Sequence, residues 1–149
     1  MKDLIRITVP SDPKYLSLIR DMTKRVGELG GLEDAVIDTL KLAIDEACTN
    51  VIRHTYRGDT GKKLRIQYKI TKGSFETVIE DSGEKVSPEL LKGRDLDDVR
   101  PGGLGIHFIK RAFDVVEYDG KKKKGNRLRL KKYLKGEQHG HRDSGLQGQ

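Results

Sequence analysis

The sequence predicts an α+β two-layer sandwich, in which helices cover one face of a mostly antiparallel sheet. Two observations predict this fold class. The spacing of apolar residues gives the element order β-α-α-β-β-loop-α-β-β, and the strand-like segments form consecutive hairpins. Because strands joined by a tight turn run in opposite directions, two such hairpins imply antiparallel pairing.

The first half of the chain predicts one strand and two helices. Residues 3–9 alternate apolar and polar side chains, as a half-buried strand does. The sequence Ser11-Asp12-Pro13 is a helix-start signal, and glycines at positions 27, 30 and 31 are expected to end the helix that follows. A second helix is expected from about Glu33 to His54.

The second half predicts two hairpins separated by a loop and a helix. The expected elements are a hairpin of residues 64–70 with 75–79, a loop over 82–102 in which 89–91 could form a short helix, an amphipathic helix over 103–113, and a hairpin of 115–118 with 127–130. Residues 1–134 therefore form one expected domain, and the polar residues 135–149 are expected to be a disordered tail.

Composition excludes several classes of protein. Cys48 is the single cysteine, so an internal disulfide and a multi-cysteine metal site are excluded. No apolar run approaches the ~18 residues of a membrane span, and the first ten residues have no apolar signal core, so we expect a cytoplasmic protein without a membrane partner.

The net charge of +7 invites a nucleic-acid interpretation. However, residues 1–120 have a net charge of −1, and residues 121–149 have a net charge of +8. After residue 120 the only aromatic residue is Tyr133, so no series of stacking side chains accompanies the basic residues. This distribution argues against a nucleic-acid partner.

Three segments carry candidate chemistry. Glu46, Asn50 and His54 are four residues apart, so they are expected along one helix face, where oxygen ligands suit Mg²⁺. Asp81 ends an apolar strand and Gly83 follows, which places a carboxylate at a sheet edge beside accessible backbone. Each pattern taken alone also fits an ordinary amphipathic helix or turn.

The third segment is a glycine cluster before the predicted helix. Gly102, Gly103 and Gly105 lie where small residues let the chain wrap phosphate oxygens, and the helix N-terminus supplies unpaired N–H groups and a positive dipole end. A plain loop-to-helix junction is the alternative, although it does not need this many glycines.

Together the three segments resemble the N, G1 and G2 boxes of the GHKL ATPase superfamily, which has the Bergerat ATP-binding fold. The residues that carry the resemblance are Glu46-x-x-x-Asn50, Asp81-x-Gly83 and Gly103-x-Gly105, in that order. The segment from Glu46 to Tyr56 and the ending from Gly125 to Leu128 resemble, more narrowly, the bacterial anti-sigma factor serine/threonine kinases.

The resemblance implies a role for each residue. Glu46 would be the general base for the attacking hydroxyl, and Asn50 would bind the Mg²⁺ that bridges the phosphates of ATP. Asp81 would accept a hydrogen bond from the adenine amino group, and Gly83 would allow close approach. The glycines at 102, 103 and 105 would wrap the phosphates, and residues 84–102 would form a lid over the nucleotide.

The sequence departs from the family pattern at two places. Lys85 stands where the G1 box usually has a second glycine. Asn126 and Arg127 stand where a threonine often helps to hold adenine through water.

The resemblance implies a sigma factor and an anti-anti-sigma protein of the STAS type as partners, with the second as substrate. It also allows a homodimer through the first strand and helix. Two alternatives stay open: a nucleotide-sensing binding module without phosphoryl transfer, and a stress-switch kinase that acts on a scaffold protein without binding a sigma factor.

Overall fold

The computed structural model describes residues 3–85, 103–119 and 124–134. Its elements are β1 (Asp3–Pro10), η1 (Pro13–Tyr15), α1 (Leu16–Leu29), α2 (Asp34–Asn50), η2 (Val51–Thr55), β2 (Lys63–Thr71), β3 (Ser74–Asp81), α4 (Gly103–Ala112), β4 (Val115–Tyr118) and β5 (Asn126–Tyr133). The predicted order of elements is confirmed. The predicted short helix at 89–91, most of the predicted lid and the predicted tail lie outside the described residues.

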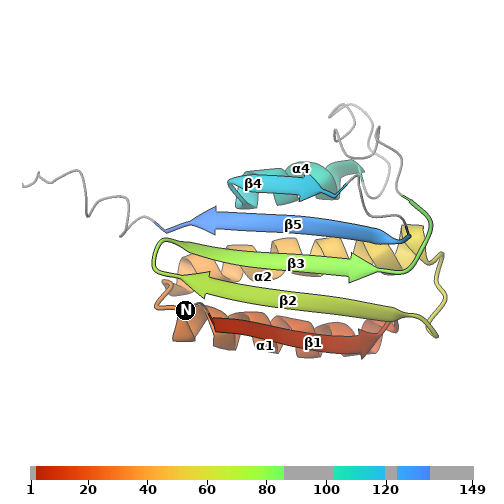
Figure 1. The fold of residues 1–149 in the computed structure, drawn as a ribbon, viewed down its shortest axis with the longest axis horizontal. Helices are drawn as coiled ribbons and strands as arrows, with labels where there is room; N and C mark the ends of the chain where they lie inside the picture. The colour runs from red at the N-terminus through yellow and green to blue at the C-terminus, as the bar shows by residue number, and fades with distance from the viewer. Residues whose placement is uncertain (1–2, 86–102, 120–123, 135–149) are drawn as a thin grey trace, which may run out of the picture.

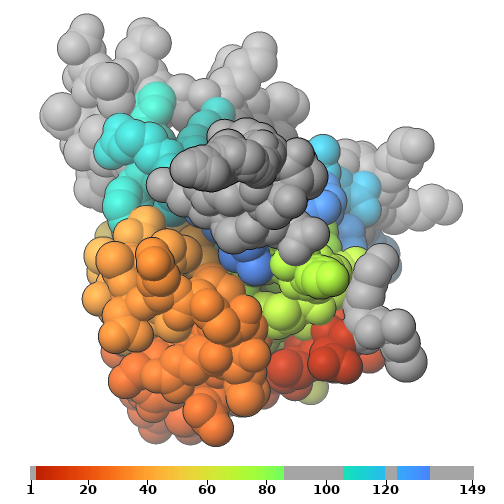
Figure 2. All heavy atoms as spheres, turned by 90° about the vertical axis from the view of Figure 1, so that its left-hand side faces the viewer, coloured from red at the N-terminus to blue at the C-terminus, as the bar shows by residue number. Residues whose placement is uncertain are grey.

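The strands form one five-stranded sheet in the order β1-β2-β3-β5-β4, and every neighbouring pair is antiparallel. Figure 1 shows the helices on one side of this sheet, and the space-filling view of Figure 2 shows α1 and α2 on one side of the molecule with the strands on the other. The α+β two-layer sandwich is therefore confirmed, with an entirely antiparallel sheet.

The core lies between the sheet and the helices. Alternate strand residues face the helices, and the central helix α2 packs against both α1 and α4. The largest fully buried side chains in this layer include Tyr68, Phe75, Ile19, Leu40 and Ile44. Cys48 is also fully buried, and this burial raises the pKa of its thiol.

Two local features differ from the prediction. The second helix is regular only to Asn50, and the chain then makes a π-helical turn in which Tyr56 N–H donates to the carbonyl of Val51. Gly27 does not end α1 but lies inside it. A side chain at this position would collide with Ile37 of α2. Close packing of the two helices therefore explains this glycine, and α1 ends at Leu29.

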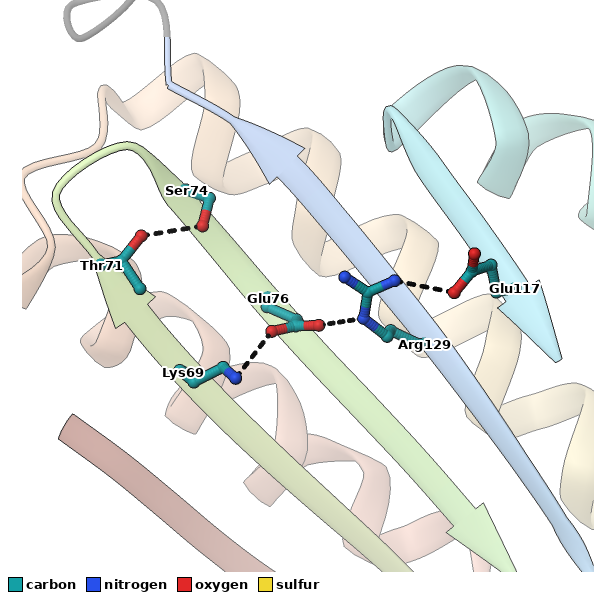
Figure 3. Close-up of polar contacts among 6 residues, drawn as sticks. All are labelled: Lys69, Thr71, Ser74, Glu76, Glu117 and Arg129. Atoms are coloured by element: carbon teal, nitrogen blue, oxygen red, sulfur yellow. Dashed lines mark hydrogen bonds and ion pairs between the residues drawn. The ribbon is translucent and has the colours of Figure 1, made fainter. Parts of the chain in front are cut away.

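Among the described residues, no helix covers the other face of the sheet, and its side chains form charge networks instead (Figure 1). In Figure 3, Glu76 of β3 lies between Lys69 of β2 and Arg129 of β5, and Arg129 also donates to Glu117 of β4 at 2.7 Å. These pairs bridge four neighbouring strands. In the described parts of the chain, no helix is long and apolar enough to cross a membrane.

Candidate functional site

Asp81 is a buried carboxylate at the end of β3, with 3% of its surface exposed. Its Oδ1 accepts a hydrogen bond from the backbone N–H of Gly83 at 2.9 Å and another from Nδ2 of Asn126 at 2.9 Å. Burial raises the pKa of this carboxyl, and hydrogen bonds from Asn126 and Gly83, together with the charge of Arg65, oppose that rise without cancelling it. A buried acid at a strand end is well suited to accept hydrogen bonds from a ligand.

Gly83 is required by the close approach of the chain that follows α2. A Cβ atom at this position would lie 2.3 Å from Cγ2 of Thr55 and 3.4 Å from the ring of Tyr56. Tyr56 also fixes the segment after Asp81, because its hydroxyl accepts from Ser82 N–H at 2.7 Å and donates to the carbonyl of Lys63 at 2.7 Å. The π-helical turn, β2 and the segment after β3 are thus tied together through one side chain.

Glu46 and Asn50 lie on the last turns of α2, and both are half-buried. Five residues later the chain reaches Thr55, which contacts Gly83, so the C-terminal end of α2 lies at the same end of the sheet as Asp81. Figure 1 shows the C-terminal ends of α2 and β3 on the same side of the molecule. His54 is exposed and lies in the π-helical turn that follows α2.

Gly103 and Gly105 lie in the first turn of α4, and Gly102 lies outside the described residues. β4 runs parallel to β3, because both pair antiparallel with β5. Only two residues join α4 to β4, so the helix must run opposite to that strand. The N-terminus of α4 therefore points to the end of the sheet where Asp81 lies.

Asn126 is a residue of this site for which the sequence predicts no role, since it stands there only as a departure from the family pattern. It is buried and faces Asp81 across the β3–β5 pair. Gly125 before it has a φ of +70°, and a Cβ there would lie 2.1 Å from the backbone oxygen of Asp81. The sequence carries a signal for a turn at Gly125-Asn126, but none for the strand register that places Asn126 against Asp81.

A cavity of about 550 Å³ opens beside this segment. Tyr56 and Gly83 line it, together with the basic residues Arg57, Lys62, Lys85 and Lys124. Of the described residues that line it, none is Glu46, Asn50 or Asp81. The cavity therefore borders the segment after β3 without including the three predicted functional side chains.

The residues present fit a magnesium ion that is bound mainly by the phosphates of a nucleotide and by water, with few protein ligands. In the described part of the chain, no group of three or more His, Cys, Asp or Glu side chains could hold a metal by itself. Mg²⁺ in nucleotide sites is bound by one or two protein oxygens together with phosphates and water. The carboxamide of Asn50, half-buried one turn after Glu46, meets that need.

Comparisons with known proteins agree with this geometry. Residues 9–132 match the family described as the histidine kinase-like ATPase domain. The serine-protein kinase RsbW of Bacillus subtilis (strain 168) is 29% identical over 148 residues, which cover 93% of this chain and 91% of that protein. The serine-protein kinase RsbW of Listeria innocua is 30% identical over 125 residues, which cover 78% of this chain and 80% of that protein.

Two solved structures share the fold. The RsbU and RsbW domains of Rv1364c from Mycobacterium tuberculosis superpose with a TM-score of 0.61 at 13% identity, over 87% of this chain and 31% of that longer chain. The histidine kinase domain of a blue-light activated kinase from Erythrobacter litoralis superposes with a TM-score of 0.55 at 12% identity, over 85% of this chain and 62% of that chain.

The family match covers most of the described elements, from the last residues of β1 to β5. A domain of this family uses ATP, in agreement with the predicted cofactor. The chain belongs to the histidine kinase-like ATPase family and, within it, to the serine/threonine protein kinases related to RsbW.

Proposed function

We propose that this kinase is an ATP-dependent anti-sigma factor, which binds a sigma factor and phosphorylates an anti-anti-sigma protein of the STAS type in the cytoplasm. The observation that carries the proposal is the arrangement at one end of the sheet. There a buried Asp81 is held by hydrogen bonds close to the helix that presents Glu46 and Asn50. The relatives named serine-protein kinase support the choice of substrate class.

In this proposal the base of ATP meets Asp81. The carboxylate accepts a hydrogen bond from the 6-amino group of adenine, and Gly83 lets the turn after α2 approach closely the segment that follows Asp81. The N–H groups at the start of α4, with Gly103 and Gly105, and the preceding Gly102, take the phosphates. These three glycines let the oxygen atoms of the phosphates approach the backbone closely.

Phosphoryl transfer depends mainly on positioning and on neutralising charge. Asn50 would hold Mg²⁺, which would supply positive charge to offset the negative charge of ATP. Glu46, one helical turn earlier on α2, would accept the proton of the attacking serine or threonine hydroxyl. Since that residue comes from a partner protein, the partner must dock near the C-terminal end of α2.

The proposal is tested by incubating the purified chain with Mg²⁺, γ-labelled ATP and a purified STAS-type protein from the same cell. We expect label on a serine or threonine of that protein. The variant Glu46→Gln should bind ATP normally and lose transfer by at least about a hundredfold. Asp38→Asn, an exposed carboxylate earlier on the same helix, is the matched control and should transfer normally. Normal transfer by the Glu46 variant would remove the role assigned to Glu46.

The sigma-factor role needs a separate measurement. We expect a complex of this chain with a sigma factor that is tighter with ATP than with ADP, and that is displaced by the unphosphorylated STAS-type protein. A homodimer formed through β1 and α1 belongs to the same proposal. Equal affinity for the sigma factor with and without nucleotide would contradict the proposed anti-sigma role, and it would not affect the proposed kinase activity.

One observation favours the alternative of a nucleotide-sensing module without transfer. Lys85 replaces the second glycine of the G1 box, and its Nζ reaches the carbonyl of Asp119 at 3.5 Å. This contact ties the start of the predicted lid to the end of β4. ATP binding without phosphorylation of any STAS-type protein would decide for that alternative.

A further inference from the structure

The side-chain nitrogen of Asn126 donates hydrogen bonds to the segment around Asp81. Its Nδ2 lies 2.9 Å from Oδ1 of Asp81 and 2.8 Å from the backbone oxygen of Glu84. Both partners are acceptors, so the nitrogen and not the oxygen of the amide must face them. The residue is 4% exposed, so water does not compete for these bonds.

The two bonds have separate consequences. The bond to Glu84 holds the first residues after β3 against β5. The bond to Asp81 falls on the same oxygen, Oδ1, that Gly83 N–H also reaches. Neither of the bonds from Gly83 and from the Asn126 side chain falls on Oδ2, the oxygen that would accept from a ligand.

We infer that Asn126 is a positioning residue that sets the base selectivity of the site, by keeping Asp81 an ionised acceptor for the 6-amino group of adenine. This inference rests on the proposed role of Asp81 in binding ATP. An ionised carboxylate can only accept, so it matches the amino group of adenine and repels the 6-oxo group of guanine. A protonated carboxyl could donate to the 6-oxo group, and selectivity would then fall.

Burial pushes Asp81 toward the protonated form, and the side-chain amide of Asn126 is the largest opposing contribution, followed by the backbone N–H groups of Gly83 and Asn126 and the positive charge of Arg65. Tyr56 and Tyr118 also lie close enough to interact with this carboxylate. Removing the side-chain donor of Asn126 should therefore raise the pKa of Asp81 further. ATP binding would then be lost at a higher pH than in the unaltered chain. A purely structural role of Asn126 would not move that midpoint.

The test measures the affinity of the full chain for ATP and GTP with Mg²⁺ between pH 5 and 8, by calorimetry. The variant Asn126→Leu keeps the size of the side chain and removes both donors. We expect its ATP affinity to fall by about tenfold to a hundredfold, as for loss of a hydrogen bond to a charged group. The ratio of ATP to GTP affinity should fall with it, and the pH midpoint of ATP binding should rise.

Arg127→Gln is the matched control, because Arg127 is the next residue of β5 and pairs with Glu80 on the uncovered face. It should keep the ATP affinity, the ratio and the midpoint. Asn126→Ser keeps one short donor and should give intermediate values, and it serves as the test variant if Asn126→Leu does not fold.

The possible results distinguish a failure of the proposed function from a failure of the role assigned to Asn126. If the unaltered chain does not bind ATP, the proposed function is wrong and this inference falls with it. If the unaltered chain binds ATP, and the Asn126 variants lower ATP and GTP affinity equally with an unchanged pH midpoint, the inference alone is overturned.

Discussion

At the scale of single residues, ionisation of Asp81 is less favourable in the folded protein than in the unfolded chain. Burial raises the pKa of its carboxyl, so folding stabilises the neutral form more than the charged one. Ligand binding in the proposed site needs the charged form. A functional residue that lowers the stability of the free protein is a common compromise at binding sites.

We therefore expect Asp81→Asn to raise the free energy of unfolding of the nucleotide-free chain at neutral pH. The amide is neutral and can still accept from Gly83 and Asn126. Below the pKa of an unfolded aspartate, Asp81 is protonated in both states, so the gain should vanish as the pH falls toward about 3. Urea unfolding at several pH values measures this, and a loss of stability at pH 7 would contradict it.

Gly125 gives a second prediction at this scale. Gly125→Ala combines a φ of +70° with a Cβ that would lie 2.1 Å from backbone, so it should lower the free energy of unfolding by about 3 kcal/mol or more. Gly58→Ala is the matched control, because Gly58 has a φ of +84° and open space around it. The control should cost only about 1 kcal/mol. If denaturant unfolding shows the same loss of free energy of unfolding for both variants, the close approach of Gly125 to Asp81 does not contribute to stability as predicted.

The sequence was sufficient to predict Glu46, Asn50, Asp81 and the glycines as candidates, because their spacing within one segment carries the signal. It was not sufficient for Asn126. Its role depends on the antiparallel register that pairs Asp81 with Asn126, and the two residues are 45 positions apart in the chain. Local patterns do not determine such a register.

At the scale of elements, the site is assembled by one strand end and the turn that follows α2. Tyr56 joins them, because its hydroxyl bonds to both Ser82 and Lys63. The periodicity of α2 predicted the helix itself. The π-helical turn after it was not predicted, because a change from i+4 to i+5 bonding leaves little trace in the spacing of apolar residues.

Tyr56→Phe tests this connection. The change leaves Ser82 N–H and the carbonyl of Lys63 without their partner, so we expect a loss of about 1–2 kcal/mol in the free energy of unfolding. ATP affinity should also fall severalfold, because the segment that contains Gly83 is less well held. Tyr133→Phe, on the exposed end of β5, is the control and should change neither quantity. If both variants behave alike, Tyr56 does not position the site.

At the scale of the whole molecule, the excess of positive charge has a structural use in the described residues. Arg127 and Arg129 of β5 pair with Glu80 and Glu76 of β3, and Lys132 lies 3.9 Å from Asp114. Part of the basic end of the sequence is therefore neutralised across the sheet. This arrangement agrees with the expectation that the net charge does not indicate a nucleic-acid partner.

The Glu76 network makes a prediction about pH. Burial alone would raise the pKa of Glu76, but its hydrogen bonds and charge interactions with Arg129 and Lys69 lower it. The stability it contributes is therefore present above the pKa of an unfolded glutamate and is lost as the pH falls through the lower folded value. Glu76→Gln should cost about 1–2 kcal/mol at pH 7 and much less near pH 2. A cost that is independent of pH would contradict this assignment.

The fold class was predictable from the sequence because the hairpins and amphipathic helices each bury one apolar face. The position of β5 between β3 and β4 was not predictable in the same way. That order sets Asp81 beside Asn126, and it arises from packing of the complete sheet.

The central claim is that Asp81 binds the adenine of ATP at the end of β3. Calorimetric titration of the full chain with ATP and Mg²⁺ tests it most directly, with Asp81→Asn compared against Glu80→Gln. Glu80 is the preceding residue of the same strand, and it faces the uncovered side of the sheet, where it pairs with Arg65 and Arg127. We predict one ATP bound per chain, an affinity about a hundredfold lower for Asp81→Asn, and an unchanged affinity for Glu80→Gln. Equal affinities in the unaltered chain and the Asp81 variant, or no binding of ATP by the unaltered chain, would contradict the claim.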